Sequence, residues 1–150
     1  MLVYRIAKAK YAFSLVASGG AARWNSSNKF VIYTAASRAL ACLENIVHFS
    51  GEGQQGLYRV MVIEIPEDIV VQHIGLKDLP KNWFRFESYP ECQLQGNQWL
   101  SDAKSAILSV PSAIIQNEIN YLINPLHADF VRIKLLDTEP FAFDPRFARL

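Results

Sequence analysis

Apolar residues along the chain recur in short runs whose spacing indicates regular structure. Short β-branched or alternating runs predict strands, and recurrence every three or four residues predicts a helix. Leu40, Leu43 and Val47 recur at helical spacing, and Thr34 or Ser37 can cap the start of that helix. The predicted strands are Leu2–Ala7, Phe30–Thr34, Leu57–Ile65, Ile69–His73 and Phe130–Leu136, and the predicted helices are Ala36–Phe49 and Asn97–Ala106.

Glycines, prolines and polar clusters predict the segments between these elements. Pro111 separates two strand-like runs, Ile107–Val110 and Ser112–Ile115, which indicates a strand edge or a bulge at the proline. The other expectations are a turn with a short helix over Lys8–Ser18, an ordered loop over Gly19–Lys29, an irregular segment with one helical turn over Leu79–Gly96, a turn or short helix over Asn117–Ile123, and a packed aromatic tail from Phe141.

The order of these elements predicts the fold class. Strands and helices do not alternate as regular strand–helix–strand units, which favours an α+β fold with mixed or antiparallel sheets over a doubly wound one. The chain has 150 residues, shows no repeat or linker and is the size of one domain with a substantial core. We therefore expect a single domain over residues 1–150.

Composition narrows the function classes. The chain has 15 basic and 14 acidic residues, for a net charge of +1, and no basic block, so a surface that tracks nucleic-acid phosphates is not indicated. Two cysteines, Cys42 and Cys92, form no metal or disulfide framework, and no His/Cys cluster has zinc spacing. No apolar stretch reaches membrane-spanning length, and the N-terminus does not resemble a signal peptide. We expect a soluble cytoplasmic protein without a metal or membrane.

Glu44 and Arg5 are the first candidates for chemistry. Glu44 lies four residues after Leu40 and three before Val47, at the rim of the buried stripe of its helix. A glutamate there fits either a solvated boundary residue or a carboxylate held in a cleft beside Tyr33. Arg5 interrupts an apolar strand run, where it fits either the solvent face or a site for a phosphate, ribose hydroxyl or carboxylate.

The segment from Gly19 to Asn25 combines small residues with a cation and an aromatic ring. Glycines let a backbone approach a ligand closely, and they also simply form turns. Neither a P-loop nor a dinucleotide fingerprint is present. Ser112 has no surrounding GxSxG elbow, which argues against a hydrolase triad, and most serines in such a context bond only to the backbone. From the residues alone, the prediction is an α+β domain compatible with an anion-binding cleft.

Seven short segments in one order resemble the RES-domain family, which is named for an arginine, a glutamate and a serine. The resemblance spans nearly the whole chain. The matching segments are Tyr4-Arg5-Ile6, Gly20–Asn25, Val31–Thr34, Ala39–Glu44, Val110–Ala113, Asn120–Pro125 and Phe143–Arg146.

The resemblance implies a fold similar to that of ADP-ribosyltransferase toxins and a toxin that acts as one half of a bacterial toxin–antitoxin pair. Members consume NAD⁺ and release nicotinamide by phosphorolysis or hydrolysis, and some relatives modify a protein instead. The implied partners are NAD⁺ as substrate, inorganic phosphate as co-substrate, and an Xre-like helix-turn-helix antitoxin that covers the active site. No further cofactor is implied, and a homo-oligomer is compatible with the resemblance.

The resemblance also implies roles for individual residues. Glu44 would stabilise positive charge on the ribose as the nicotinamide bond breaks, and Tyr33 would stack against the nicotinamide ring. Arg5 would hold the pyrophosphate or an attacking phosphate, and Ser112 would hydrogen-bond the ligand without acting as a nucleophile.

The implied nucleotide-binding residues are Arg23, Trp24 and Asn25, with Arg23 in the same phosphate-holding role as Arg5. The chain departs from the family pattern by Ala21 and Ala22 before Arg23, which affects the expected shape of this loop. Two alternatives remain beside NAD⁺ breakdown. One is ADP-ribosylation of a protein, and the other is an NAD-binding module without catalysis.

Overall fold

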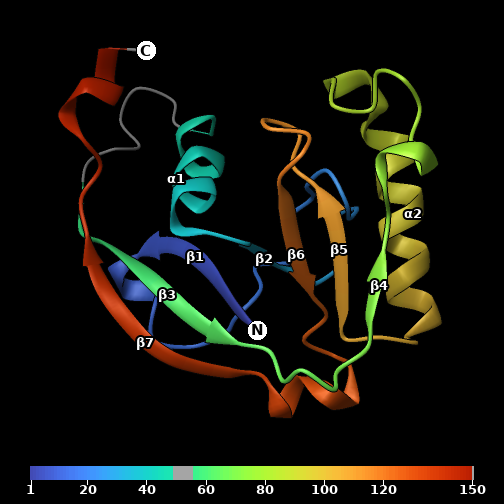
Figure 1. The fold of residues 1–150 in the computed structure, drawn as a ribbon, viewed down its shortest axis with the longest axis horizontal. Coiled ribbons are helices and arrows are strands. Elements are labelled where there is room, and N and C mark those ends of the chain that lie inside the picture. The colour runs from blue at the N-terminus through green and yellow to red at the C-terminus, as the bar shows by residue number, and fades with distance from the viewer. Residues whose placement is uncertain (49–55, 150) are drawn as a thin grey trace.

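The structure, a computed structural model, describes residues 1–48 and 56–149. The described residues form seven strands, two α-helices and several short 3₁₀ turns (Figure 1). The strands are β1 (Leu2–Lys8), β2 (Ile32–Ala35), β3 (Tyr58–Glu64), β4 (Val71–His73), β5 (Ile107–Pro111), β6 (Ile119–Ile123) and β7 (Lys134–Phe141), and the helices are α1 (Arg38–Ile46) and α2 (Tyr89–Asp102).

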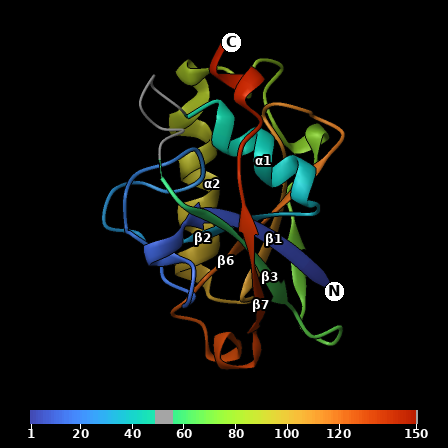
Figure 2. The same ribbon diagram turned by 90° about the vertical axis from the view of Figure 1, so that its left-hand side faces the viewer.

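All seven strands belong to one sheet in the order β4-β5-β6-β2-β1-β3-β7. Only β4 and β5 pair in parallel, and every other neighbouring pair is antiparallel. The predicted α+β class with a mixed sheet is thus confirmed. In Figure 1 the sheet bends strongly, and β5 and β6 stand between α1 and α2. The view in Figure 2 agrees, with α1 nearer to the viewer and α2 farther away.

Both faces of β1 are buried, because the curved sheet is covered on two sides. Val3 and Ala7 pack into a cluster with Met61 and Ile63 of β3. Tyr4 and Ile6 point to the opposite face, where they pack with residues of α1. The expected alternation along this strand is therefore correct, but neither face is the solvent face that one interpretation of Arg5 required.

Helix α1 follows β2 after two residues and is capped as expected. The Ser37 hydroxyl accepts a hydrogen bond from the backbone N–H of Leu40 at 3.1 Å, which satisfies one of the free donors of the first turn. Leu40 and Ala41 are the buried residues of the helix, and they pack on β1 and β3. The helix is shorter than predicted at both ends, and Phe49, its expected last residue, lies outside the described residues.

Helix α2 begins eight residues earlier than predicted, at Tyr89. The prediction of an irregular segment through Gly96 treated Pro90 as a helix breaker, but a proline is tolerated in the first turn, where its missing N–H would have no partner anyway. The helix ends at Asp102, because Ala103 adopts a left-handed conformation with φ of 47°. The predicted helix over Ala103–Ala106 is therefore wrong.

The largest error concerns Asn117–Ile123, where a turn or short helix was predicted. Ile119–Ile123 forms β6, which pairs with β2 on one side and β5 on the other. Pairing on both sides outweighs the local preference of its asparagine. Ser112–Ile115 is not a strand, because the Ser112 hydroxyl accepts hydrogen bonds from the backbone N–H groups of Ile114 and Ile115 and closes a turn.

Two further predictions at the end of the chain are partly correct. Phe130 belongs to a 3₁₀ turn, Ala128–Arg132, and β7 starts at Lys134 and runs beyond the predicted end at Leu136. The aromatic tail packs as expected: the rings of Phe141 and Phe143 meet edge to face, with their centroids 4.9 Å apart. Pro111 is the last residue of β5, beyond the end of its pairing with β4, so its missing N–H removes no hydrogen bond to that strand.

Candidate functional site

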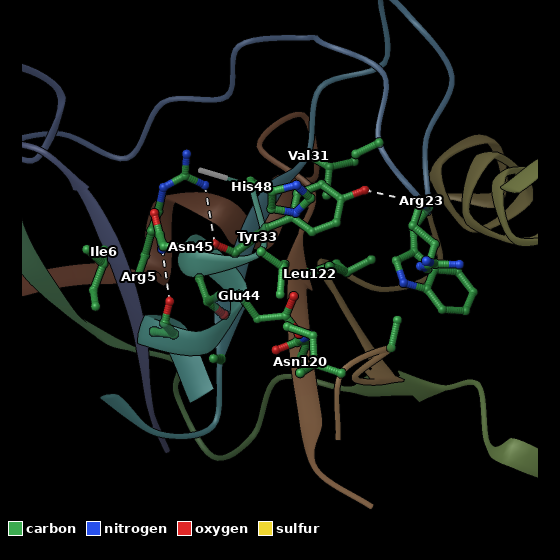
Figure 3. Close-up of a pocket in the computed structure, with 18 of the residues that line it drawn as sticks. Arg5, Ile6, Arg23, Val31, Tyr33, Glu44, Asn45, His48, Asn120 and Leu122 are labelled. Carbon is green, nitrogen blue, oxygen red and sulfur yellow. Dashed lines mark hydrogen bonds between the residues drawn. The ribbon is translucent and has the colours of Figure 1, made fainter. Parts of the chain in front are cut away.

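A cavity of about 760 Å³ lies where β1, β2 and α1 meet the segment before β2 and the end of β6. Five of the predicted site residues line it, namely Arg5, Arg23, Trp24, Tyr33 and Glu44. Figure 3 shows Arg5 and Arg23 at opposite sides of this cavity, with Tyr33 and Glu44 between them. The cavity therefore joins residues that are far apart in the sequence, and its size suits an organic ligand.

Glu44 is half-buried and firmly held, so it is not a solvated residue at the edge of its helix. Its Oε1 accepts a hydrogen bond from the Ser112 hydroxyl at 2.8 Å and another from Nδ2 of Asn120 at 2.6 Å. Among the described residues, no group donates a hydrogen bond to Oε2. The carboxylate is anchored through one oxygen, and the other keeps its acceptor capacity for a ligand.

Ser112 supports Glu44 from below and does not line the cavity. Its side chain is fully buried, its hydroxyl hydrogen goes to Glu44, and its oxygen accepts from two backbone N–H groups. A hydroxyl has one hydrogen and two lone pairs, so this serine has no free capacity. The predicted hydrogen bond from Ser112 to the ligand is thus replaced in this structure by a bond to Glu44.

Arg5 supplies a cation at one side of the cavity. It is half-buried, and its Nη1 donates to the backbone carbonyl of Tyr33 at 3.2 Å. No carboxylate forms an ion pair with it among residues 1–48 and 56–149, and burial lowers the pKa of its guanidinium. A guanidinium that loses water without gaining a counter-charge is stabilised by a bound anion. Arg5 therefore has the properties of an anion-binding residue.

Tyr33 is locked at its tip. Its hydroxyl donates to Oδ1 of Asn25 at 2.6 Å and accepts from the backbone N–H of Trp24 at 3.2 Å. Burial raises the pKa of the Tyr33 phenol. The only hydroxyl hydrogen is already donated to Asn25, and the ring of Tyr33 forms part of the cavity wall, so the ring is the part of this residue that is available to a ligand.

The Arg23 guanidinium forms its hydrogen bonds with the protein backbone. Its two terminal nitrogens donate to the backbone carbonyls of Trp83, Phe84 and Arg85, at 2.7, 2.8 and 3.3 Å. It also lies 4.4 Å from the centre of the Tyr89 ring. This arginine fixes the segment before α2 against the cavity, and Phe84 and Tyr89 of that region line it.

Trp24 and Asn25 occupy supporting positions. Both side chains are buried, with 3% and 1% of their surface exposed. Asn25 donates from Nδ2 to the carbonyls of Gly20, Ser26 and Lys29, and these bonds close the loop that precedes β2. Their expected contact with NAD⁺ stays a prediction, whereas their structural role is to shape the loop that carries Arg23.

Sequence reasoning missed Asn120 and three residues at or just beyond the end of α1 that line the cavity, Asn45, Val47 and His48. Asn45 and His48 follow Glu44 by one and four residues, and the spacing of four could have placed His48 on the glutamate's side of the helix. Asn120 belongs to a segment matched to the family, but it was assigned to a turn, so nothing suggested that it would meet Glu44.

Residues 1–48 and 56–149 contain neither a metal-binding cluster nor a membrane-spanning helix. No group of three or more His, Cys, Asp or Glu side chains there is placed to hold a metal ion. Likewise, none of the helices in those ranges is both long and apolar enough to cross a membrane.

Comparison with known proteins adds an independent view of this geometry. The model of the RES domain family matches residues 2–144. The toxin Res of Yersinia enterocolitica is 36% identical over 153 residues, covering 97% of this chain and 99% of that protein. The Prs ADP-ribosylating toxin of Sphingobium sp. is 35% identical over 132 residues, covering 85% of this chain and 80% of that protein.

The fold has a solved counterpart in the crystal structure of the M. tuberculosis MbcT–MbcA toxin–antitoxin complex. One chain of that complex superposes with a TM-score of 0.77 over 99% of this chain and 86% of the other, at 16% sequence identity. At that identity the likeness concerns the fold alone. The family match and the two relatives reach further, and they show that this chain belongs to the RES-domain family, whose arginine and glutamate match Arg5 and Glu44 in the cavity and whose serine matches Ser112 beneath Glu44.

Proposed function

We propose that this protein is the toxin of a toxin–antitoxin pair and that it breaks the bond between nicotinamide and ribose in NAD⁺. The observation that carries the proposal is the state of Glu44, anchored through Oε1 and unpartnered at Oε2 among the described residues, in a cavity that also holds the uncompensated cation Arg5. A fixed carboxylate and a fixed cation in one cavity match a substrate whose reacting centre becomes positive and whose other groups are anionic phosphates.

Glu44 would act on the developing charge of the ribose. As the carbon–nitrogen bond breaks, its electron pair goes to the nicotinamide ring, which leaves as a neutral molecule, and the anomeric carbon gains oxocarbenium character. A preorganised carboxylate stabilises that charge without having to reorient at the moment of reaction, which contributes on the order of 3–4 kcal/mol per group. Because nicotinamide is already a cationic leaving group, no general acid is needed.

Arg5 would bind a phosphate group of one of the two substrates. The attacking group must form a new bond to the anomeric carbon, and attack by inorganic phosphate would give ADP-ribose 1″-phosphate. Attack by water would give ADP-ribose and one proton. The half-buried guanidinium of Arg5, which has no counter-charge among the described residues, favours an anion in either role, as the attacking phosphate or as the pyrophosphate of NAD⁺. Tyr33 would present its ring to the nicotinamide.

Phosphorus NMR of NAD⁺ with the purified chain, with and without added phosphate, tests the acceptor. We expect NAD⁺ signals to disappear and a sugar 1″-phosphate signal to appear only when phosphate is present. Equal consumption of NAD⁺ without phosphate would show that the acceptor is water and that the reaction is hydrolysis. If NAD⁺ stays intact under both conditions, with folded protein free of antitoxin, NAD⁺ breakdown is ruled out as the function.

A second candidate function is transfer of ADP-ribose to a protein. It is favoured by the 35% identical relative, which is named an ADP-ribosylating toxin. The transition state at the ribose would be the same, and only the acceptor would differ. Incubation of the chain with labelled NAD⁺ and a host lysate separates the two, because transfer labels a protein band, whereas phosphorolysis leaves the label in small molecules.

The proposed partner is an Xre-like antitoxin that covers the cavity. The relatives named as Res toxins and the likeness to a chain of a toxin–antitoxin complex support a partner of this general kind. Co-expression with the product of a neighbouring helix-turn-helix gene should yield a stable complex that neither releases nicotinamide nor arrests growth. Separate elution of the two proteins would contradict the partner assignment.

A further inference from the structure

Asn120 stands at the base of the cavity in the middle of the sheet. It lies on β6, opposite Ala35 of β2 and Val110 of β5, and is therefore paired on both sides. Its Nδ2 donates to Oε1 of Glu44 at 2.6 Å. Its Oδ1 is buried without a hydrogen-bond partner in the described part of the chain. The amide thus serves Glu44 and leaves its own carbonyl unsatisfied.

The orientation of this amide follows from the glutamate. The two ends of an asparagine side chain are nearly the same size, so only hydrogen bonding decides which end faces Glu44. The opposite orientation would bring Oδ1 to 2.6 Å from Oε1 and place two acceptors in contact. A buried carbonyl without a partner costs free energy, so a contact with a charged group is what maintains this arrangement.

Asn120 and Ser112 converge on the same carboxylate oxygen from two different segments. Asn120 approaches from β6, and Ser112 approaches from the turn that follows β5. A glutamate side chain on a helix can otherwise rotate about three bonds. Two donors on Oε1 remove this freedom and fix the direction of Oε2, the oxygen that has no protein partner among the described residues.

We propose that Asn120 is a positioning residue for Glu44, which it holds in the orientation that stabilises the positive ribose. This inference rests on the proposed NAD⁺ cleavage. It adds a second residue, beside Ser112, that holds Glu44 in place by a hydrogen bond. Asn120 acts through Glu44, so its removal lowers the rate of the bond-breaking step and leaves substrate binding largely intact.

Replacement of Asn120 by leucine tests this positioning role, because leucine has the same branched shape and the same number of side-chain heavy atoms and removes the Nδ2 donor and the Oδ1 acceptor together. We expect kcat for nicotinamide release to fall at least tenfold, with KM within about twofold of the original value. Asn117→Leu, in the exposed turn before β6, is the matched control and should retain full activity. An unchanged kcat, or a rise in KM as large as the fall in kcat, would overturn the proposal.

Asn120→Asp provides a second variant of the same shape. It places a carboxylate where the amide donated, so the loss of kcat should equal or exceed that of the leucine variant. A purely structural role for Asn120 makes a different prediction. Both variants would then lose activity only in proportion to their loss of folded protein. Circular dichroism measured on the same samples separates the two explanations.

A double-mutant cycle with Glu44→Gln completes the test. If Asn120 acts through the carboxylate, Asn120→Leu should change the residual rate of Glu44→Gln by less than about twofold. Independent, multiplicative losses would overturn the proposal. A wild-type chain that releases no nicotinamide would contradict the proposed function instead. The Asn120–Glu44 coupling would then be measured in thermal unfolding by a cycle of Asn120→Leu with Glu44→Leu, because leucine removes the acceptor. Additive changes in melting temperature would overturn the coupling.

Discussion

Ser112 donates its only hydroxyl hydrogen to Oε1 of Glu44 at 2.8 Å, and its oxygen receives the backbone N–H groups of Ile114 and Ile115. The serine is fully buried beneath the glutamate. Two of the three residues that give the family its name are therefore joined directly. Glu44 faces the cavity, and Ser112 holds it there.

Ser112→Ala should reduce catalysis without abolishing it. The variant loses one of the two donors on Glu44, and the turn after β5 loses a side-chain acceptor, at a cost of about 1 kcal/mol in the free energy of unfolding. We expect nicotinamide release to slow roughly ten- to a hundredfold, as when a single preorganised hydrogen bond is lost from an active site.

The same variant also separates support from nucleophilic catalysis. Mass spectrometry of wild-type protein quenched during turnover should detect no ADP-ribose attached to the chain. An adduct on Ser112, or complete loss of activity in a fully folded Ser112→Ala, would assign the serine a covalent role and contradict the account.

Tyr33 should make the protein sensitive to alkali. Burial raises the pKa of its phenol in the folded state above the value of about 10 expected in the unfolded chain. The unfolded state therefore releases the proton first as pH rises, so the stabilisation is fully present below about pH 10 and is lost as pH rises toward the folded value. Urea titrations between pH 8 and 11 measure this fall in the free energy of unfolding.

Tyr33→Phe is the control for that measurement. It should be less stable at neutral pH by about 1–3 kcal/mol, because Oδ1 of Asn25 loses its hydrogen bond, but it should lack the part of the alkaline slope that Tyr33 contributes. The same slope in both proteins would show that other groups cause the alkaline loss.

Arg23→Lys should loosen the segment before α2. A lysine ammonium is a single point of charge and cannot reach three successive carbonyls as the planar guanidinium does. We expect a lower melting temperature and a several-fold rise in KM for NAD⁺, with a smaller change in kcat. Arg85→Lys, which alters an exposed neighbour, is the matched control, and equal effects in the two variants would contradict the anchoring role.

Gly96→Ala should prevent α2 from docking. A Cβ at Gly96 would lie 1.8 Å from the backbone oxygen of Trp24, a distance that only backbone movement can relieve. Overpacking of a buried helix contact typically costs 1–3 kcal/mol, and a clash this close should cost more than that range. Thermal unfolding should show a large loss of stability, with Gly75→Ala as a control at a half-buried turn where a Cβ would meet nothing closer than 3.4 Å. A melting temperature equal to that of the wild type would contradict the packing described here.

Local sequence patterns predicted the elements whose own residues favour the structure that they form. The periodicity of Leu40, Leu43 and Val47 and the cap at Ser37 placed α1 correctly, and the apolar run of β3 was evident. Strand β6 escaped prediction because its asparagine argues against a strand, and only pairing with β2 and β5 makes it one. Pro90 concealed about the first two turns of α2, because a proline there can also signal an irregular segment.

The candidate site also contains residues that the sequence predicted and residues that it did not. Glu44, Arg5 and Tyr33 were found because the chain resembles a known family, and the structure brings all three to one cavity. Position in a helix or strand did not decide whether Glu44 and Arg5 were solvated. Asn120 meets Glu44 across 76 positions of sequence, and Arg23 reaches carbonyls about 60 positions away. Contacts of that range depend on the sheet order, which no local pattern specifies.

The most direct test of the central claim is the rate of nicotinamide release by wild-type protein and by Glu44→Gln, measured by chromatography on samples of equal circular dichroism. Glutamine keeps the shape and the hydrogen bonds to Ser112 and Asn120 but removes the negative charge. The account predicts steady release by the wild type and a rate at least a hundredfold lower in the variant, consistent with about 3 kcal/mol of electrostatic stabilisation. Equal rates in the two proteins would contradict it.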